Sequence, residues 1–505
     1  MPVIYDHSPL REKSRKALAD DFKHEAIKTA QNVITGKRDL LVQEVPEWEE
    51  MRDKAAQIRD HVLSNLDYYV KEFVTNAQKT GCQVYFAPTG EDAVEQVLEI
   101  FAAEQTDFCV KSKSMVTEEI GLNEALNEHG ITAVETDCAE HILQTAGDPP
   151  SHIVVPALHF ERNSIRDLYS RKKGYTGSSD PEEITHFLRR TLREDFLRAK
   201  IGVTGCNFGI ASTGSCTLVT NEGNGRMVTA APETQIVLMG TERILPDLES
   251  LDVMINLLVR SAVGAKITSS FSVNTGPRQP GEIDGPAEVH IILVNNGRSQ
   301  ILSSKYREML RCIRCGACMN TCPVYRHITG HGYGSIYPGP MGVVLTPLLT
   351  DYHEAAGITD ACTLCGACAD VCPVKIPLNE LIWEHRQDYV ESGQPSSTQK
   401  AVFEAAAATM RHRSVYAAAT KLGAVGMQAL SRDGQVGKSS AWLPIWGNLT
   451  QTRDLPPLAK QRFSEQFTQH QRERKLGSSP ALQSEHRPEI QSHPQKPSSK
   501  QTQGN

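Results

Sequence analysis

The sequence predicts an α/β domain, then a mainly helical dicluster ferredoxin-like domain, then a helical C-terminal region. Between residues 81 and 300, short apolar runs alternate with amphipathic segments of helical periodicity, which is typical of a largely parallel sheet covered by helices. Residues 301–390 contain two runs of four cysteines, and residues 391–469 are alanine-rich and helix-prone. A chain of 505 residues has room for two or three domains with cores of their own.

Residues 1–80 are charged and predict a helical N-terminal arm. Within this segment Ala55, Ile58, Val62 and Leu66 recur at the spacing of one helix face. We therefore expect an amphipathic helix here that packs through this apolar face.

The α/β domain, residues 81–300, is predicted from nine short apolar runs. The predicted strands are 84–86, 108–110, 131–134, 153–155, 201–203, 216–219, 236–239, 266–268 and 289–294. A Gly- and Asn-rich turn at 220–226 follows one of them, and turns at strand ends are where open α/β sheets bind ligands. A simple tight turn is the alternative, because no full phosphate-loop motif is present.

Two cysteine runs in residues 301–390 have the same spacing, C-x2-C-x2-C-x3-C-P. The first consists of Cys312, Cys315, Cys318 and Cys322, and the second of Cys362, Cys365, Cys368 and Cys372. This is the bacterial ferredoxin spacing, in which each run supplies three ligands to one [4Fe–4S] cluster and the fourth to the other. The spacing therefore predicts two [4Fe–4S] clusters and electron transfer.

The crossed fourth ligands assign each cysteine to a cluster. The first cluster is assigned Cys312, Cys315, Cys318 and Cys372, and the second Cys322, Cys362, Cys365 and Cys368. Gly316 and Gly366 stand at equivalent places and allow the backbone to approach each cluster. The aromatic loop 327–340 is expected to pack over a cluster and limit access of water.

Structural zinc and disulfides are the alternatives for these cysteines. Zinc sites usually take two separated C-x2–4-C pairs, which triplets followed by Cys-Pro match poorly. Disulfides require an oxidising compartment, and the N-terminus has no basic-then-apolar signal. Cys82, Cys109, Cys138, Cys206 and Cys216 lack ligand spacing and are interpreted as small buried hydrophobes.

Charge and hydropathy exclude two classes of partner. The net charge of −7 and a pI near 6.2 give no electrostatic footprint for nucleic acid. No run approaches the roughly 20 apolar residues of a transmembrane segment. We therefore expect a cytoplasmic protein, with association to a membrane only through partners.

Lys111, Lys113 and Arg226 are the candidates for binding an anion, a carboxylate or phosphate, in the α/β domain. The alternative is a solvated face or structural ion pairs, because charged side chains are usually at the surface. We assign no catalytic residue.

The end of the chain changes in composition near residue 470. Residues 470–505 are rich in Gln, Ser, Lys, Pro and His, and predict a disordered tail. Before the tail, the apolar segment 442–446 is expected to dock within the protein.

Several segments together resemble the lactate utilization protein B family. The segments that carry the resemblance are 110–115, 118–123, 134–137, 149–153, 220–226, 284–286, 294–299 and 312–327. The resemblance implies an α/β domain of the ribose-phosphate isomerase and coenzyme A transferase type. It also implies an iron–sulfur, non-catalytic electron-transfer subunit that works with two other subunits in oxidising L-lactate to pyruvate, in a complex of the L-lactate dehydrogenase type.

A [4Fe–4S] cluster carries one electron at a time, so the removal of a hydride from lactate must occur elsewhere. The chain has no G-x-G-x-x-G fingerprint that would indicate a flavin or nicotinamide of its own. The electron acceptor is not specified by the sequence. The alternatives are an electron-transfer subunit for another 2-hydroxy acid such as glycolate, a heterodisulfide-reductase-like complex, and a regulatory binding protein with structural clusters.

Overall fold

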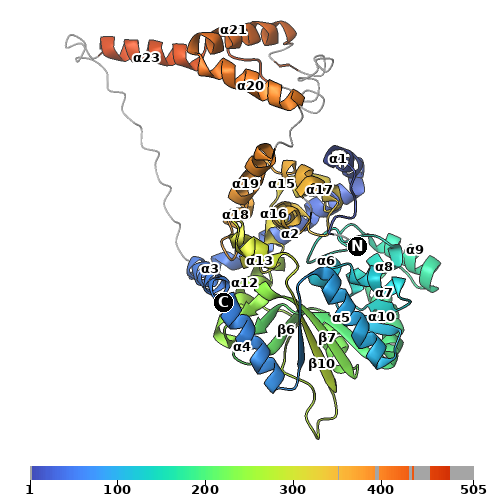
Figure 1. Ribbon diagram of the computed structural model, residues 1–505. Coiled ribbons are helices and arrows are strands. Elements are labelled where there is room, and N and C mark those ends of the chain that lie inside the picture. The colour runs from blue at the N-terminus through green and yellow to red at the C-terminus, as the bar shows by residue number, and fades with distance from the viewer. Residues whose placement is uncertain (1–2, 351, 393–396, 432–434, 437–454, 478–505) are drawn as a thin grey trace, which may run out of the picture. The chain divides into compact units, whose positions relative to one another are not determined.

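The computed structural model describes residues 3–350, 352–392, 397–431, 435–436 and 455–477. Two compact units divide the chain, Met1–Gln394 and Pro395–Asn505. The first unit contains the parallel sheet and both cysteine runs, and Figure 1 shows its helices and strands.

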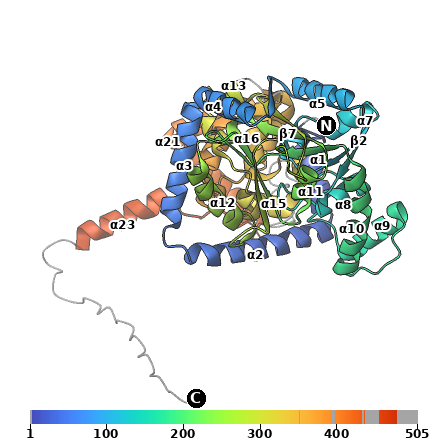
Figure 2. The ribbon, with the colours of Figure 1, turned by 90° about the horizontal axis from the view of Figure 1, so that it is seen from below.

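Four helices precede the first strand. They are α1 (Leu10–Leu18), α2 (Asp21–Gln43), α3 (Trp48–Ser64) and α4 (Leu66–Lys79). In α3 the predicted apolar face is buried at Ala55, Ile58 and Val62. Helix α2 lies alongside α12 (Leu248–Val263) and α15 (Pro323–Ile328), as Figure 2 shows. The N-terminal helices therefore join the α/β domain to the region of the cysteine runs.

The main sheet has six strands, all parallel, in the order β1-β10-β7-β4-β2-β3. The strands are β1 (Gln83–Ala87), β2 (Phe108–Lys111), β3 (Thr132–Glu135), β4 (Ile201–Gly205), β7 (Thr234–Gly240) and β10 (Glu288–Val294). Strand β7 is buried on both faces: Ile236 belongs to one apolar core and Val237 to another. This explains its continuous apolar run and confirms the predicted parallel-sheet α/β region.

Helices cover both faces of this sheet. One core contains α5 (Gly90–Glu104) and α7 (Leu122–Glu128), and the core on the other face contains α4. The remaining helices of the domain are α6 (Met115–Glu119), α8 (Cys138–Ala146), α9 (Arg162–Lys173), α10 (Pro181–Arg198) and α11 (Asn224–Ala230). Capping side chains mark where some of these helices begin. Thr89 and Asp92 form a capping box at α5, and Asp137 caps α8.

A second sheet, in the order β8-β5-β6-β9, packs beside the first. Its strands are β5 (Phe208–Ile210), β6 (Ser215–Thr220), β8 (Ile244–Leu245) and β9 (Ser270–Asn274), and the 3-10 turn η1 (Thr241–Arg243) precedes β8. Of these strands, only β6 was predicted. The others are short or half-exposed and carry little periodicity of their own.

Two predicted strands are wrong. Residues 153–155 form a loop, because the N–H groups of Val154 and Val155 donate to His152 Nδ1 at 3.0 and 3.1 Å instead of to a neighbouring strand. Residues 266–268 are irregular, and Thr268 Oγ1 donates to the Thr220 carbonyl at 3.0 Å before β9 begins. Local side-chain hydrogen bonds compete with strand pairing at both places.

The rest of the first unit is mainly helical, as predicted, and shares one apolar core with α3 and α12. Its elements are α13 (Arg298–Leu302), η2 (Arg307–Arg311), α14 (Ala317–Asn320), α15, η3 (His331–Tyr333), α16 (Gly339–Leu349), α17 (Tyr352–Ala355), η4 (Ala356–Asp360), α18 (Ala367–Asp370) and α19 (Leu378–Glu391). The loop before α9 docks here: Tyr325 donates from its hydroxyl to the Ser151 carbonyl at 2.6 Å.

The described part of the second unit contains α20 (Ser397–Arg411), α21 (Arg413–Leu430) and α23 (Phe463–Gly477). Residues 470–477, the first part of the expected disordered tail, lie in α23. Residues 478–505 and the apolar segment 442–446 lie outside the described residues.

Acid is expected to weaken the α/β domain through His141. Burial, and then Lys173, lowers the pKa of this histidine to about 4, and its Nδ1 lies 3.0 Å from the Tyr169 hydroxyl. The folded state therefore keeps His141 neutral, while the unfolded chain binds a proton below about pH 6.5. Stability from this group is full above pH 6.5 and is lost as the pH falls towards 4, by up to about 3 kcal/mol.

Urea unfolding at pH 7 and at pH 5 measures this loss. His141→Gln should lose less stability on acidification than the wild type, whereas His186→Gln, at an exposed position on α10, should behave like the wild type. Equal losses in His141→Gln and the wild type would contradict the assignment.

Candidate functional site

The two cysteine runs fold into the same local structure. Gly316 and Gly366 have φ of 76° and 83°, and Arg314 and Leu364 have φ of 59° and 57°. The backbone N–H of Arg314 donates to Cys312 Sγ at 3.5 Å, and that of Leu364 to Cys362 Sγ at 3.3 Å. A left-handed conformation at a non-glycine residue costs of order 1–3 kcal/mol, and such strain clusters at functional sites.

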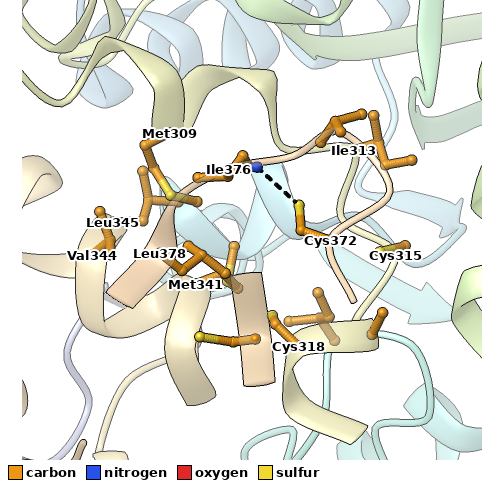
Figure 3. Packing of buried hydrophobic residues seen from close by; sticks show 14 of the residues in the cluster. Met309, Ile313, Cys315, Cys318, Met341, Val344, Leu345, Cys372, Ile376 and Leu378 are labelled. Carbon is orange, nitrogen blue, oxygen red and sulfur yellow. Dashed lines mark hydrogen bonds between the residues drawn. The ribbon is translucent and has the colours of Figure 1, made fainter. Parts of the chain in front are cut away.

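The fourth cysteine of each run is held differently. Cys322 precedes Pro323 and caps α15, and its Sγ accepts the N–H of Tyr325 at 3.4 Å. Cys372 Sγ accepts the N–H of Ile376 at 3.4 Å, the contact drawn in Figure 3. These donors point at sulfur atoms, which is the arrangement that tunes iron–sulfur clusters.

Side chains from other elements hold the cysteine carbonyls in place. Arg243 donates to the Cys312 carbonyl at 2.6 Å, and Arg386 to that of Cys362 at 2.7 Å. Arg52 donates to the Cys372 carbonyl at 2.9 and 3.1 Å. Arginines from other parts of the chain thereby fix each run. Two of these three arginines, Arg243 and Arg52, donate to cysteines assigned to the first cluster.

The electrostatic neighbours of Cys315 and Cys368 follow the crossed grouping, while Cys318 has neighbours in both sets. Burial, and then Cys372, raises the pKa of Cys315. Burial, and then Cys362 and Cys322, raises the pKa of Cys368 to about 12. Figure 3 shows Cys372 near Cys315, although the two belong to different runs. The ligand assignment stays a prediction, and this arrangement supports it.

The donor set fits a cluster. Buried thiols with raised pKa values do not ionise by themselves at neutral pH, and a metal centre supplies the charge that stabilises thiolates. Within the described residues, no three His, Cys, Asp or Glu side chains are close enough to hold a single metal ion. A cuboidal cluster takes one protein ligand at each iron and does not require three ligands around a single ion.

The aromatic loop 327–340 packs near the second cluster's assigned cysteines. Tyr333 is 2 % exposed, and burial, then Cys322, raises its pKa. Tyr325 stacks on Tyr333 with ring centroids 6.3 Å apart. Tyr333 of this loop therefore lies beside Cys322, and the packing of the loop over a cluster stays a prediction.

The two runs differ in exposure. Cys365 is exposed and Cys362 is half-buried, whereas Cys315 and Cys318 are buried. A Cβ on Gly316 would lie 3.0 Å from His152 Cε1, while one on Gly366 would meet no atom within 4 Å. The α/β domain thus covers Gly316 in the first run, whereas Cys365 in the second run is exposed.

A cavity of about 420 Å³ separates the α/β domain from the first run. Its lining includes Ser112 and Lys113 after β2, Cys206 and Asn207 after β4, and Arg314 between Cys312 and Cys315. A Cβ on Gly205 would lie 2.6 Å from Ser114 Oγ, so glycine allows the two loops to approach each other.

The three predicted anion-binding residues are not gathered in one place. Lys111 is completely buried and its Nζ contacts Glu135 at 2.5 Å and Glu118 at 3.3 Å. Lys113 lines the cavity and lies 3.6 Å from Glu140. Arg226 is exposed on α11 and is not among the residues that line the cavity. Only Lys113 therefore faces the cavity.

Sequence reasoning missed the arginines at this site. Arg243 and Arg314 lie beside the first run, and Arg298 lies between the carboxylates of Glu119 and Glu242. Arg314, which has a left-handed backbone conformation, lies within the cysteine motif. That position is the one feature of the sequence that could have identified it as a site residue. Of the remaining cysteines, Cys138 and Cys206 are only half-buried, and Cys206 lines the cavity.

The fold and the site define a protein that joins a parallel-sheet α/β domain to a 4Fe-4S dicluster module. Residues 70–294 match the LUD domain family, and residues 308–376 match the 4Fe-4S dicluster domain family. The chain belongs to the lactate utilization protein B family, since it is about half identical to such proteins over nearly its whole length.

Three relatives illustrate the match. "Lactate utilization protein B" of Geobacillus kaustophilus (strain HTA426) is 47% identical, and that of Shouchella clausii (strain KSM-K16) 45% identical. "Uncharacterized electron transport protein YkgF" of Escherichia coli (strain K12) is 46% identical. Each alignment covers 94% of this chain and 99% of the relative. Across the described residues, every helix is too short or too polar to cross a membrane.

Proposed function

We propose that this protein relays electrons during the oxidation of L-lactate to pyruvate, as the iron–sulfur subunit of a complex with two other subunits. The observation that carries the proposal is the pair of cysteine runs with sulfur-directed N–H donors, in a chain similar throughout to proteins named for lactate utilization. The oxidation releases two electrons, and each bound [4Fe–4S] cluster carries one electron at a time.

The chain supports such a relay through the two ligand sets. Cys312, Cys315, Cys318 and Cys372 would hold the first cluster beside the cavity, and Cys322, Cys362, Cys365 and Cys368 the second. Exposed Cys365 supports contact between the second cluster and a partner. Buried arginines at the cysteine carbonyls would fix the first cluster and offset its negative charge.

The α/β domain would have the ribose-phosphate isomerase and coenzyme A transferase type of fold. A parallel six-stranded sheet with a smaller mixed sheet beside it supports this assignment. Because a fold by itself does not define an activity, the domain's role must come from its site.

Anaerobic reconstitution with the co-purified partners tests the proposal. L-Lactate should bleach the cluster absorbance of this chain and produce pyruvate in proportion. Cys365→Ser removes an exposed cluster ligand and should abolish electron transfer. Cys138→Ser, outside both runs, should leave electron transfer intact.

Two results would redirect the proposal. Bleaching by glycolate but not by L-lactate would identify another 2-hydroxy acid as the substrate. Clusters that stay oxidised with every substrate while the partners turn over would make them structural, and the protein a regulatory binding module.

A further inference from the structure

The cavity over the first cysteine run lies at the topological switch point of the main sheet. Strand β2 pairs with β3 on one side and β4 on the other, and from β4 the chain continues away from β3 to β7. Loops that leave the carboxyl ends of β2 and β4 therefore diverge, and open α/β sheets bind their ligands in the crevice between such loops. Ser112 and Asn207 come from these two loops.

Two polar atoms in this crevice have no hydrogen-bond partner within the described chain. They are Ser112 Oγ and Lys113 Nζ, and both atoms are inaccessible to solvent. Ser112 as a whole is only 3 % exposed. Leaving a buried donor unsatisfied costs about 1–3 kcal/mol, more for a charged group, so these two donors indicate an acceptor that binds in the cavity.

The cavity is lined by four cations, Lys113, Arg243, Arg298 and Arg314, and by three carboxylates, Asp137, Glu222 and Glu242, so its charge balance favours an anion. Arg314 lies 3.8 Å from one oxygen of Glu242, and Arg298 lies 2.5 Å from the other. Lys113 has only the 3.6 Å contact with Glu140. Two cations thus line the cavity without a close carboxylate of their own, while the neighbouring Lys111 is satisfied by Glu135 at 2.5 Å.

We propose that this cavity binds a small oxyanion, a carboxylate or phosphate, through Ser112, Lys113 and Arg314. A volume of about 420 Å³ suits a small molecule. Because the backbone N–H of Arg314 donates to Cys312 Sγ at 3.5 Å, an anion bound to the Arg314 side chain would alter the surroundings of the first cluster. The inference deepens the proposed function and rests on it only for the choice of carboxylate probes.

Anaerobic calorimetry on the cluster-loaded full chain tests the site with L-lactate, pyruvate and inorganic phosphate as separate probes. We expect saturable binding of at least one. Lys113→Ala and Ser112→Ala should each weaken it about ten-fold or more, the size of one lost hydrogen bond to a charged group. Lys113→Arg should retain most of the affinity, and Lys172→Ala, exposed on α9, should retain all of it.

Electron paramagnetic resonance of the reduced protein gives a second readout. The bound anion should shift the signal of the first cluster in the wild type and in Lys172→Ala, but not in Lys113→Ala at the same concentration. Cluster content and circular dichroism identify any variant that fails to fold, and if Lys113→Ala is one of them, Ser112→Ala decides the test.

The outcomes separate this inference from the proposed function. Saturable binding of the carboxylates alone, or of phosphate alone, supports the site and shows which kind of oxyanion it takes. No saturable binding of any probe, or unchanged affinity in Lys113→Ala and Ser112→Ala, overturns the inference even if L-lactate still reduces the clusters through partners. Intact binding without such reduction overturns the proposed function instead.

Discussion

Cys322→Ser is expected to destroy the cluster that the second run mainly holds, although Cys322 belongs to the first run. Burial is the main reason that the pKa values of both thiols are raised, and after burial the largest influence is Cys372 at Cys315, and Cys362 followed by Cys322 at Cys368. Removing one thiolate leaves an iron without its protein ligand. Bound iron should therefore fall from about eight to about four atoms per chain.

Electron paramagnetic resonance and iron analysis of the reduced protein measure this effect. Cys315→Ser and Cys365→Ser provide the reference spectra, because each removes a ligand whose run is not in question. Cys322→Ser should match Cys365→Ser, and Cys372→Ser should match Cys315→Ser. Cys138→Ser, outside both runs, should retain both signals. A Cys322→Ser spectrum that matched Cys315→Ser would show that the fourth ligands are not exchanged.

Arg298→Met is expected to destabilise the first unit by about 3–5 kcal/mol, since it leaves two buried carboxylates without their cation. Arg298 lies 2.8 Å from Glu119 and 2.5 Å from Glu242, and all three side chains are at least 96 % buried. Burial raises the pKa of Glu242, but Arg298 and the neighbouring arginines outweigh it and bring the pKa down to about 2. Tyr337 also donates to Glu119 at 2.7 Å.

Lys305→Met is the matched control for this loss. Lys305 also contacts two carboxylates, Glu384 at 2.8 Å and Asp388 at 2.6 Å, but it is 45% exposed. Surface pairs contribute about 0–1 kcal/mol. Anaerobic urea unfolding at pH 7 compares the two variants, and a similar small loss in both would mean that the buried network contributes little.

The sequence by itself determined the fold class and the chemistry of the centre. Parallel strands such as β7 are buried on both faces, so their apolar runs are visible without the structure. Cysteine spacing is a local property, and the turn that it requires recurs at Arg314 and Leu364 with nearly the same φ. Residues 153–155 show the limit: an apolar run does not reveal that His152 accepts its N–H groups.

Only the tertiary structure decided which polar residues meet. Lys111 ends strand β2 and pairs with Glu135 inside the domain, whereas Lys113 lies in the loop that follows β2 and lines the cavity. Arg314 reaches the same cavity from the cysteine motif, about two hundred residues away along the chain. A pattern in the sequence predicts the environment of residues that are close along the chain. This cavity, its charge and its unpaired donors depend instead on the packing of distant segments.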